Sequence, residues 1–284
     1  MKVCVIGGAN VDITARSGAA FRFGDSNPGR VDVSWGGVGR NIAHNLALLG
    51  DEVELITIFG GGLFAPVIAA ACRNAQINIS HSEIAGEGTN SFFVAINNAD
   101  GELIGGVADM NATEGITPAW LAERIDIINS ADAIVAEANL CAESLAYLID
   151  NTEKPLYLDA VSVAKSSRIK EAAAISNKKS FFALKCNAIE YQALESIDAS
   201  IQRRYVSRGA EGLWVEENGK VYEFAALPCI VRSTTGGGDA LLSGIVHAGP
   251  HAGIEESARA GLLCARCAVE SPYAVSEELK NLSI

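Results

Sequence analysis

The chain has 284 residues, of which 49% are hydrophobic, and its formal net charge is −12. This length suits one large α/β domain or two small ones, and the negative charge argues against nucleic acid as a partner. No apolar run is long enough to cross a membrane, and Gly7-Gly8 interrupts the first run too early for a signal sequence, so we expect neither anchor nor leader. Seven scattered cysteines, an odd number, predict reduced thiols in a cytoplasmic protein.

Short apolar runs alternate with helical patterns along the chain. Strands are expected at Val3–Ile6, Val53–Ile58, Ala133–Ala136, Leu156–Leu158, Phe181–Leu184, Tyr205–Ser207 and Leu213–Glu216. Helices are expected at Arg40–Leu49, Leu63–Ala75, Pro118–Asn129, Ala142–Asn151, Ser166–Ser176, Ala240–His247 and Ile254–Val269. Short apolar strands separated by helices predict an α/β fold whose central, mostly parallel sheet is covered on both faces. We expect one domain over residues 1–284.

Two segments break this alternation. Residues 13–35 show no helical pattern and are rich in Gly, Ser and Asp. Residues 89–108 predict a hairpin with its turn at Asp100-Gly101. Taken alone, both segments are also consistent with ordinary surface loops.

Three consecutive glycines followed by an acid occur in Ser233-Thr-Thr-Gly-Gly-Gly-Asp239, directly before a helical pattern. Such a turn can direct several backbone N–H groups at one point, and a helix N-terminus adds its positive end. The turn therefore suits a phosphate, which an aspartate would repel. That conflict disappears if Asp239 takes a proton from a hydroxyl that then attacks the phosphoryl group. Taken alone, the motif is equally consistent with a capped glycine-rich turn.

A second glycine-rich motif, Gly36-Gly-Val-Gly-Arg-Asn41, opens an apolar helical pattern that Gly50 closes. The first expected strand leads into Asn10 and Asp12, and ligands of open α/β sheets gather at the carboxyl edge of the strands. A carboxylate there can accept from two neighbouring hydroxyls, and Asn41 can both donate and accept. Singly, Asp12 is also consistent with a turn and Asn41 with a helix cap.

Together these motifs resemble the N-x-D, G-G-x-G-x-N and D-T-x-G-A-G-D motifs of the PfkB (ribokinase-like) family of sugar and nucleoside kinases, in the same order. Segments such as Asp25-Ser-Asn-Pro-Gly29 and Asp109-Met-Asn111 look most like the pseudouridine kinase branch of that family. The resemblance implies a ribokinase-like fold in which 13–35 and 89–108 form a small β lid over the sugar, with a homodimer through the lid. It also implies ATP-dependent phosphorylation of the 5′-hydroxyl of a small ribosyl compound, assisted by Mg²⁺.

The resemblance also assigns roles to individual residues. The catalytic base would be Asp239, and the anion hole would be formed by Gly236, Gly237 and Gly238. The substrate would be bound by Asn10, Asp12, Asn27, Gly36, Gly37, Asn41, Thr89, Asn111, Glu137, Asn139 and Lys165, with Asp25 and Phe92 as further lid or base contacts. ATP would be bound by Lys185, Asn187, Ser207, Gly209, Gly212 and Thr235, and Mg²⁺ would be held through water by Asn187 and Glu190.

The chain departs from the family pattern at three positions. Ser233 replaces the first Asp of D-T-x-G-A-G-D, which leaves activation by a monovalent cation open, and Gly237 replaces alanine. Cys186 stands where proline is usual in the K-P-N-x-x-E motif. The absence of G-x-x-x-x-G-K-[ST] excludes a P-loop kinase. Two alternatives remain: another acceptor such as ribose or a purine nucleoside, and a non-catalytic nucleoside-binding protein.

Overall fold

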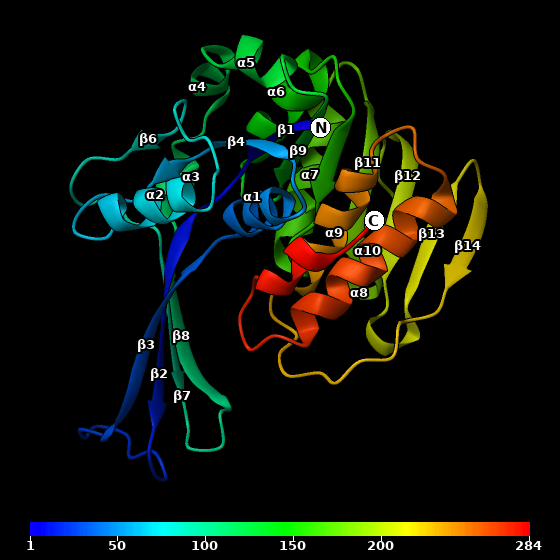
Figure 1. Ribbon diagram of the computed structural model, residues 1–284. Coiled ribbons are helices and arrows are strands. Elements are labelled where there is room, and N and C mark those ends of the chain that lie inside the picture. The colour runs from blue at the N-terminus through cyan, green and yellow to red at the C-terminus, as the bar shows by residue number, and fades with distance from the viewer.

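The computed structural model describes all residues, 1–284, and its central layer is an eight-stranded sheet (Figure 1). The strand order is β14-β13-β12-β11-β10-β9-β1-β4. The six strands from β12 to β4 are parallel, and β13 pairs antiparallel with both β12 and β14. The strand bounds are β1 (Lys2–Ile6), β4 (Glu52–Ile56), β9 (Ala133–Glu137), β10 (Leu156–Asp159), β11 (Ser180–Asn187), β12 (Ser200–Ser207), β13 (Leu213–Glu217) and β14 (Lys220–Phe224).

Helices cover both faces of the sheet (Figure 1). One face is covered by α1 (Val38–Leu48), α2 (Ala65–Asn74), α9 (Gly237–Ala248) and α10 (Ile254–Val269). The other is covered by α3 (Asn111–Glu114), α4 (Pro118–Ala122), α5 (Ile125–Asn129), α6 (Ala142–Asn151), α7 (Val163–Ile175) and α8 (Ala188–Leu194). Two short 3₁₀ turns, at Gly209–Glu211 and Glu277–Asn281, complete the helical elements.

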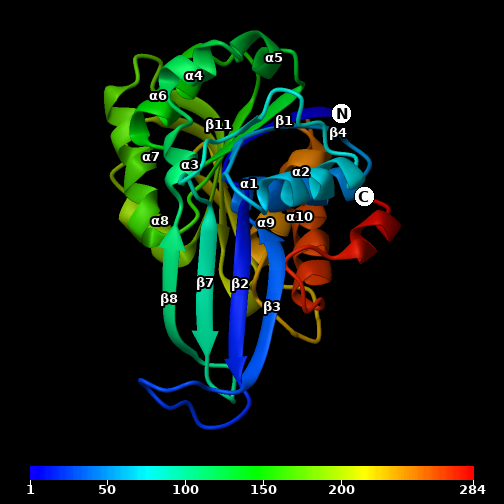
Figure 2. The same cartoon turned by 90° about the vertical axis from the view of Figure 1, so that its left-hand side faces the viewer.

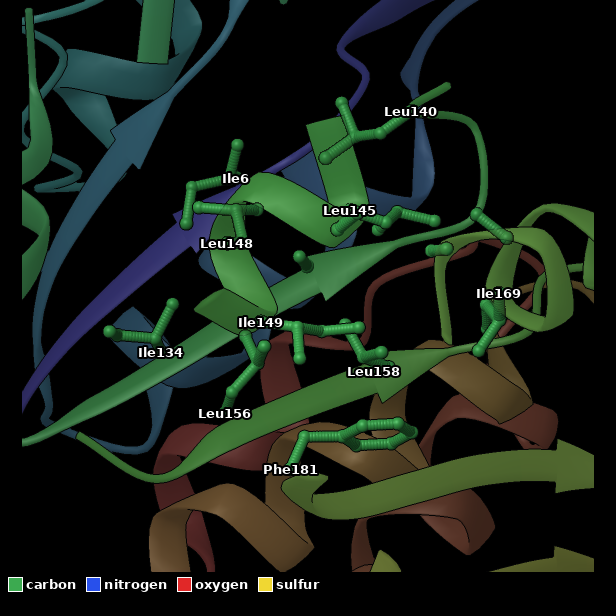
Figure 3. Packing of buried hydrophobic residues seen from close by; sticks show 14 of the residues in the cluster. Ile6, Ile134, Leu140, Leu145, Leu148, Ile149, Leu156, Leu158, Ile169 and Phe181 are labelled. Carbon is green, nitrogen blue, oxygen red and sulfur yellow. The ribbon is translucent and has the colours of Figure 1, made fainter. Parts of the chain in front are cut away.

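The period of two along each strand explains why the core has two halves. In β1, Val3 and Val5 point to the half that contains α1 and α9, whereas Cys4 and Ile6 point to the half that contains α6 and α7. Both sets are fully buried, as expected for a parallel sheet with helices on each side. Figure 3 shows the second half, where leucine and isoleucine side chains of α6 interdigitate with those of β9 and β10.

A second, four-stranded sheet projects from the body of the molecule (Figure 2). Its order is β3-β2-β7-β8, with bounds β2 (Asn10–Ser17), β3 (Gly29–Gly36), β7 (Phe92–Asn97) and β8 (Leu103–Asp109). The segments expected to form the lid lie in this sheet, which we call the lid sheet. A short parallel pair, β5 (Ile58–Phe59) and β6 (Glu83–Ile84), lies apart from both sheets.

The predicted α/β architecture, with its mostly parallel sheet and small β lid, is confirmed. One expected helix, Pro118–Asn129, is instead the two helices α4 and α5. Arg124 has a non-helical backbone between them, and its guanidinium stacks on the Trp120 ring at 3.6 Å while it bonds to Glu83. These contacts outside the helix stabilise the break.

Other boundaries also differ from the prediction, and some elements were not predicted. The expected strand Val53–Ile58 is divided at Thr57 between β4 and β5. Strand β12 begins at Ser200, five residues before the apolar run, because Ser200 and Ile201 pair with β11 and the next residues, Arg203 and Arg204, form ion pairs with β13. Strand β14 and helix α8 were not predicted, since β14 is largely exposed and α8 has only seven residues.

Candidate active site

Asn10 and Asp12 lie where the chain leaves β1 and enters the lid sheet. The Asn10 side-chain amide donates to Asp12 Oδ1, which fixes the carboxylate. Burial raises the pKa of Asp12 to about 6, although the bond from Asn10 and the charge of Arg40 oppose the shift. A partly buried carboxylate of this kind has a free oxygen for a hydroxyl ligand.

The Gly36-Gly37 pair shapes the adjoining backbone. A Cβ on Gly36 would lie 2.6 Å from Asp12 Cγ, so only glycine leaves room for that carboxylate. Gly37 has φ 95°, a left-handed conformation that favours glycine, and it is the N-cap of α1. The first turn of α1 places Asn41 on the side of the helix that meets α9.

The catalytic turn predicted from the three glycines precedes α9. Gly236 has φ 80°, and a Cβ there would overlap the backbone of Ala274. Gly237 N–H donates to the Thr234 carbonyl at 3.3 Å, whereas the N–H groups of Gly238 and Asp239 donate to no acceptor in the chain. Two free amides at the positive end of a twelve-residue helix form a site for an oxyanion.

Asp239 joins this turn to the N-terminal motif, because Asn41 Nδ2 donates to Asp239 Oδ2 at 2.9 Å across 198 residues of sequence. Burial, and next the negative charge of Asp159, raise the pKa of Asp239 to about 6; Lys185 and Asn41 oppose the shift. A carboxylate whose pKa lies near neutrality is a stronger base than an ordinary aspartate. The expected base thus lies beside the expected sugar-binding residues.

Lys185 and Asp159 form a buried ion pair below this turn, at the carboxyl ends of the adjacent strands β11 and β10. Lys185 Nζ lies 3.0 Å from Asp159 Oδ2 and would lie 2.6 Å from a Cβ on Gly238. Burial lowers the pKa of Lys185, but the carboxylates of Asp159 and Asp239 outweigh it and raise the net value. The sequence analysis missed Asp159, although an acid directly after an apolar strand was a signal for it.

Asn187 and Glu190 form a capping box at the start of α8. The Asn187 backbone N–H donates to Glu190 Oε2 at 2.8 Å, and the Asn187 side chain donates to Oε1 at 2.7 Å. Burial, and also the charge of Asp159, raise the pKa of Glu190. Each carboxylate oxygen keeps a lone pair, so Glu190 could accept hydrogen bonds from the water shell of a Mg²⁺ ion.

A cavity of about 540 Å³ adjoins the catalytic turn. Its walls come from the turn between β12 and β13, the loop before the catalytic turn, the start of α9 and one side of α10. Among the residues expected to bind ATP, Ser207, Gly209 and Gly212 line it together with Gly237 and Gly238. Its mainly apolar lining and its volume suit a nucleoside portion, with phosphates directed at the free amides. Lys185, Asn187 and Thr235 lie outside this lining, and Thr235 N–H donates to Ser233 Oγ.

Glu137 is fully buried, and its position departs from the expected contact with substrate. Oε1 accepts from Gly8 N–H at 2.8 Å and Oε2 from Asn139 N–H at 2.6 Å. Burial raises its pKa to about 7. Glu137 therefore braces the carboxyl ends of β1 and β9. Asn139 accepts a hydrogen bond from Lys165 of α7, and this pair remains only partly buried at the same edge.

The lid residues divide into two groups. Thr89 and Asn111 lie at the base of the lid, beside the point where β2 and β7 begin: Val11 N–H bonds to Ser91 O, and Asn111 donates to Asp109. Asn27 lies at the far tip, in the loop between β2 and β3, where its side chain bonds only within the loop (Figure 2). This loop follows Ser17, the last residue of β2, which is about 17 Å along the strand from Asp12. The structure does not bring Asn27 to the other site residues.

Known proteins are similar to this chain over nearly its whole length. The model of the pfkB family of carbohydrate kinases matches residues 1–281. Pseudouridine kinase of Escherichia coli is 30% identical over 305 aligned positions, which cover 99% of this chain and 95% of that protein. A carbohydrate kinase from Agrobacterium tumefaciens superposes with a TM-score of 0.83 at 30% identity, over 99% of this chain and 95% of the other.

Ribokinase from Arabidopsis thaliana, solved with ribose and ATP, has a TM-score of 0.83 at 17% identity and covers 99% of each chain. At this identity the likeness supports the fold. The expected resemblance to the PfkB family is confirmed by the family match across the chain and by the pseudouridine kinase homologue. The chain therefore belongs to the pfkB family of carbohydrate kinases.

Proposed function

We propose that this kinase transfers the γ-phosphoryl group of ATP to the 5′-hydroxyl of a ribosyl compound, and that its acceptor is pseudouridine. The observation that carries the proposal is the hydrogen bond between Asn41 and Asp239, because it sets a base of raised pKa beside the sugar-binding motif. The similarity to pseudouridine kinase over nearly the whole chain supports the choice of acceptor.

In this mechanism Asp239 accepts the proton of the attacking hydroxyl. Asn41 holds the carboxylate, and Asp12 accepts hydrogen bonds from the sugar diol so that one hydroxyl points at the phosphoryl group. The free N–H groups of Gly238 and Asp239 donate to the phosphoryl oxygens as negative charge moves onto them. The chain thus supplies positioning, a base and an anion hole.

Mg²⁺ would be held through water by Asn187 and Glu190, and when bound it neutralises charge on the donor phosphates. The capping box keeps both side chains in place before any ion arrives. Ser233, in place of an acid, leaves no carboxylate at the position linked to monovalent cations in relatives, so we expect the enzyme to work without K⁺ activation.

The lid sheet would cover the acceptor and keep water from replacing it as the attacking group. We also propose that two chains associate through the lid, because Val31, Val33, Ile96 and Val107 are exposed there. No helix in the chain has the length and apolarity to span a bilayer. Its free cysteines suit a reducing compartment, and we place the enzyme in the cytoplasm.

A substrate panel tests the proposal. ADP release would be measured with Mg-ATP and, in turn, pseudouridine, uridine, ribose, inosine and fructose. We expect the largest kcat/KM with pseudouridine and a product phosphorylated at the 5′ position by ³¹P NMR. A larger kcat/KM for ribose or inosine would reassign the acceptor but keep the reaction. Absence of turnover with every compound, together with a nucleoside-dependent rise in Tm, would instead indicate a non-catalytic nucleoside-binding protein.

A further inference from the structure

The cavity beside the catalytic turn contains a single charged residue in its wall, Arg266 of α10. The other residues that line it are small, apolar or hydroxyl-bearing. A lone cation in such a wall is costly unless something compensates it, because burial weakens its hydration. The charge is therefore a feature that the apolar character of the cavity does not explain.

Arg266 has no partner within the chain. No ion pair joins it to a carboxylate. Its Nε atom is buried without an acceptor. A buried donor without a partner destabilises the folded chain, so an acceptor supplied by a ligand would be bound favourably. A guanidinium offers donors in a planar fork that matches the oxygens of a phosphate.

The position of Arg266 along α10 places it near the phosphates. Val269, one turn later, accepts backbone bonds from Arg232 and Ser233 at 2.8 and 3.2 Å, and its Cγ1 lies 3.1 Å from a Cβ built on Gly237. Val269 therefore marks the end of α10 that touches the anion turn. Arg266 is three residues earlier, about 4.5 Å along the helix axis. An arginine side chain easily covers that distance.

Two neighbouring cations are already paired, and a third, Arg232, is exposed and lies outside the cavity lining. Lys185 is already neutralised by Asp159. Arg208 pairs with Glu211 and Glu223. With a net charge of −12, the chain as a whole repels a nucleoside triphosphate. The cation in the cavity wall that has no internal counter-ion is Arg266.

We propose that Arg266 binds the α- and β-phosphates of the nucleotide donor and so sets the affinity for ATP and ADP. This inference rests on the proposed function, since it assigns the cavity to the donor. It makes Arg266 a positioning residue, which acts on the donor and not on the acceptor.

Titration calorimetry and steady-state kinetics test this role with R266Q, R266K and the control R259Q. Arg259 lies on the same helix and is exposed outside the cavity, so R259Q makes the same change in net charge. For R266Q we expect the Kd of ADP and the KM of ATP to rise about 10- to 100-fold. The KM of the nucleoside acceptor and the Kd of adenosine should stay within about twofold of wild type. Tm should not fall, because the substitution removes a buried donor that has no partner. R266K should recover part of the ADP affinity, and R259Q should match wild type.

The outcomes separate this inference from the proposed function. If R266Q weakens adenosine as much as ADP, the guanidinium acts on the nucleoside or on the fold, and the inference fails. The inference also fails if R266Q and R259Q bind ADP equally well. In that case, turnover by the wild-type enzyme would still support the proposed kinase reaction. If the wild-type protein binds no ADP at any concentration, both the role of Arg266 and the proposed kinase function are overturned.

Discussion

Asp239 is in a position that favours reactivity over stability. Its carboxylate is removed from water and lies near Asp159, so the folded protein holds it at a pKa of about 6 instead of the usual 3.8. At neutral pH the group is ionised in both the folded and the unfolded chain, and the ionised form is disfavoured in the fold. The difference corresponds to about 3 kcal/mol of stability lost above pH 6 and recovered as the pH falls toward 4.

We predict opposite effects of Asp239→Asn on turnover and on stability. Turnover should fall about 10³-fold or more, because the amide cannot accept the proton of the hydroxyl. The free energy of unfolding at pH 7.5 should rise by about 1–3 kcal/mol, since the buried charge is removed. Denaturation in urea at pH 7.5 and pH 4.5 checks this, and the difference between wild type and variant should shrink at the lower pH. Near-normal turnover of the D239N enzyme would disprove the assigned base.

The pH dependence of kcat/KM should report the ionisation of two carboxylates. Asp12 and Asp239 both have a pKa of about 6, and both must be ionised to accept from hydroxyls. We expect log kcat/KM to fall below pH 6 with a slope that approaches two, measured between pH 4.5 and 8. In D12N the slope should approach one, with a raised acceptor KM. A flat profile down to pH 5 would contradict the shifted pKa values.

Some site residues were predicted from the sequence to lie together, and they do so in the structure. Their positions are fixed by local backbone chemistry. Glycines that form tight turns mark Asn41 and Asp239, and the hydrogen bond between them follows from the fold. Asp159 and Arg266 were not found, because their roles come from neighbours distant in sequence: a lysine on the next strand and a cavity wall. The bracing of β1 and β9 by Glu137 was not predicted for a similar reason, since its two backbone partners depend on how these strands meet.

At the scale of elements, the passage from β3 into α1 is fixed by the space around Asp12. The Gly36 Cα lies so close to that carboxylate that any side chain would displace it. This contact couples the geometry of a lid strand to Asp12, the acid proposed to bind the sugar, since β3 pairs with β2 along its whole length.

We therefore predict that Gly36→Ala raises the acceptor KM about tenfold or more while the KM of ATP changes little, measured by steady-state kinetics. The control is Gly105→Ala in β8, another lid strand, where a Cβ would meet nothing within 4 Å. Gly105→Ala should keep wild-type kinetics. Equal behaviour of the two variants would show that the close approach at Gly36 does not matter for binding.

Element boundaries were harder to predict than element types. The buried strands of the main sheet were visible as apolar runs, because both of their faces are covered. The first half of β12 was not, because backbone pairing with β11 and ion pairs to β13 stabilise it, and neither leaves an apolar pattern. The break between α4 and α5 depends on a stack between Arg124 and Trp120 that spacing alone does not show.

At the scale of the molecule, one face of the lid sheet carries a row of apolar side chains. The strand register places Val33 beside Ile13, Ile13 beside Val94, and Val94 beside Val107, so they share one face. Val33 is 47% exposed and Val107 is 68% exposed. Contiguous exposed apolar side chains on a sheet are typical of an interface between proteins.

We predict that the wild-type protein sediments at twice the 29.7-kDa chain mass and that the double variant Val33→Lys/Val107→Lys sediments as the single chain. Lysine at both positions would bring like charges together across the interface. Val221→Lys is the control, since Val221 is 48% exposed on β14, away from the lid. Analytical ultracentrifugation that finds a wild-type monomer, or an unchanged dimer in the double variant, would refute association through this face.

The bond from Asn41 to Asp239 has a consequence for synthesis of the enzyme. The ribosome completes the segment that contains Asp12 and Asn41 early, but Asp239, the proposed base, is made only with the last fifth of the chain, and α9 must dock on α1. A nascent or prematurely terminated polypeptide can thus fold much of its sheet and remain inert toward phosphoryl donors. Chemical competence arrives late, when the chain is nearly finished.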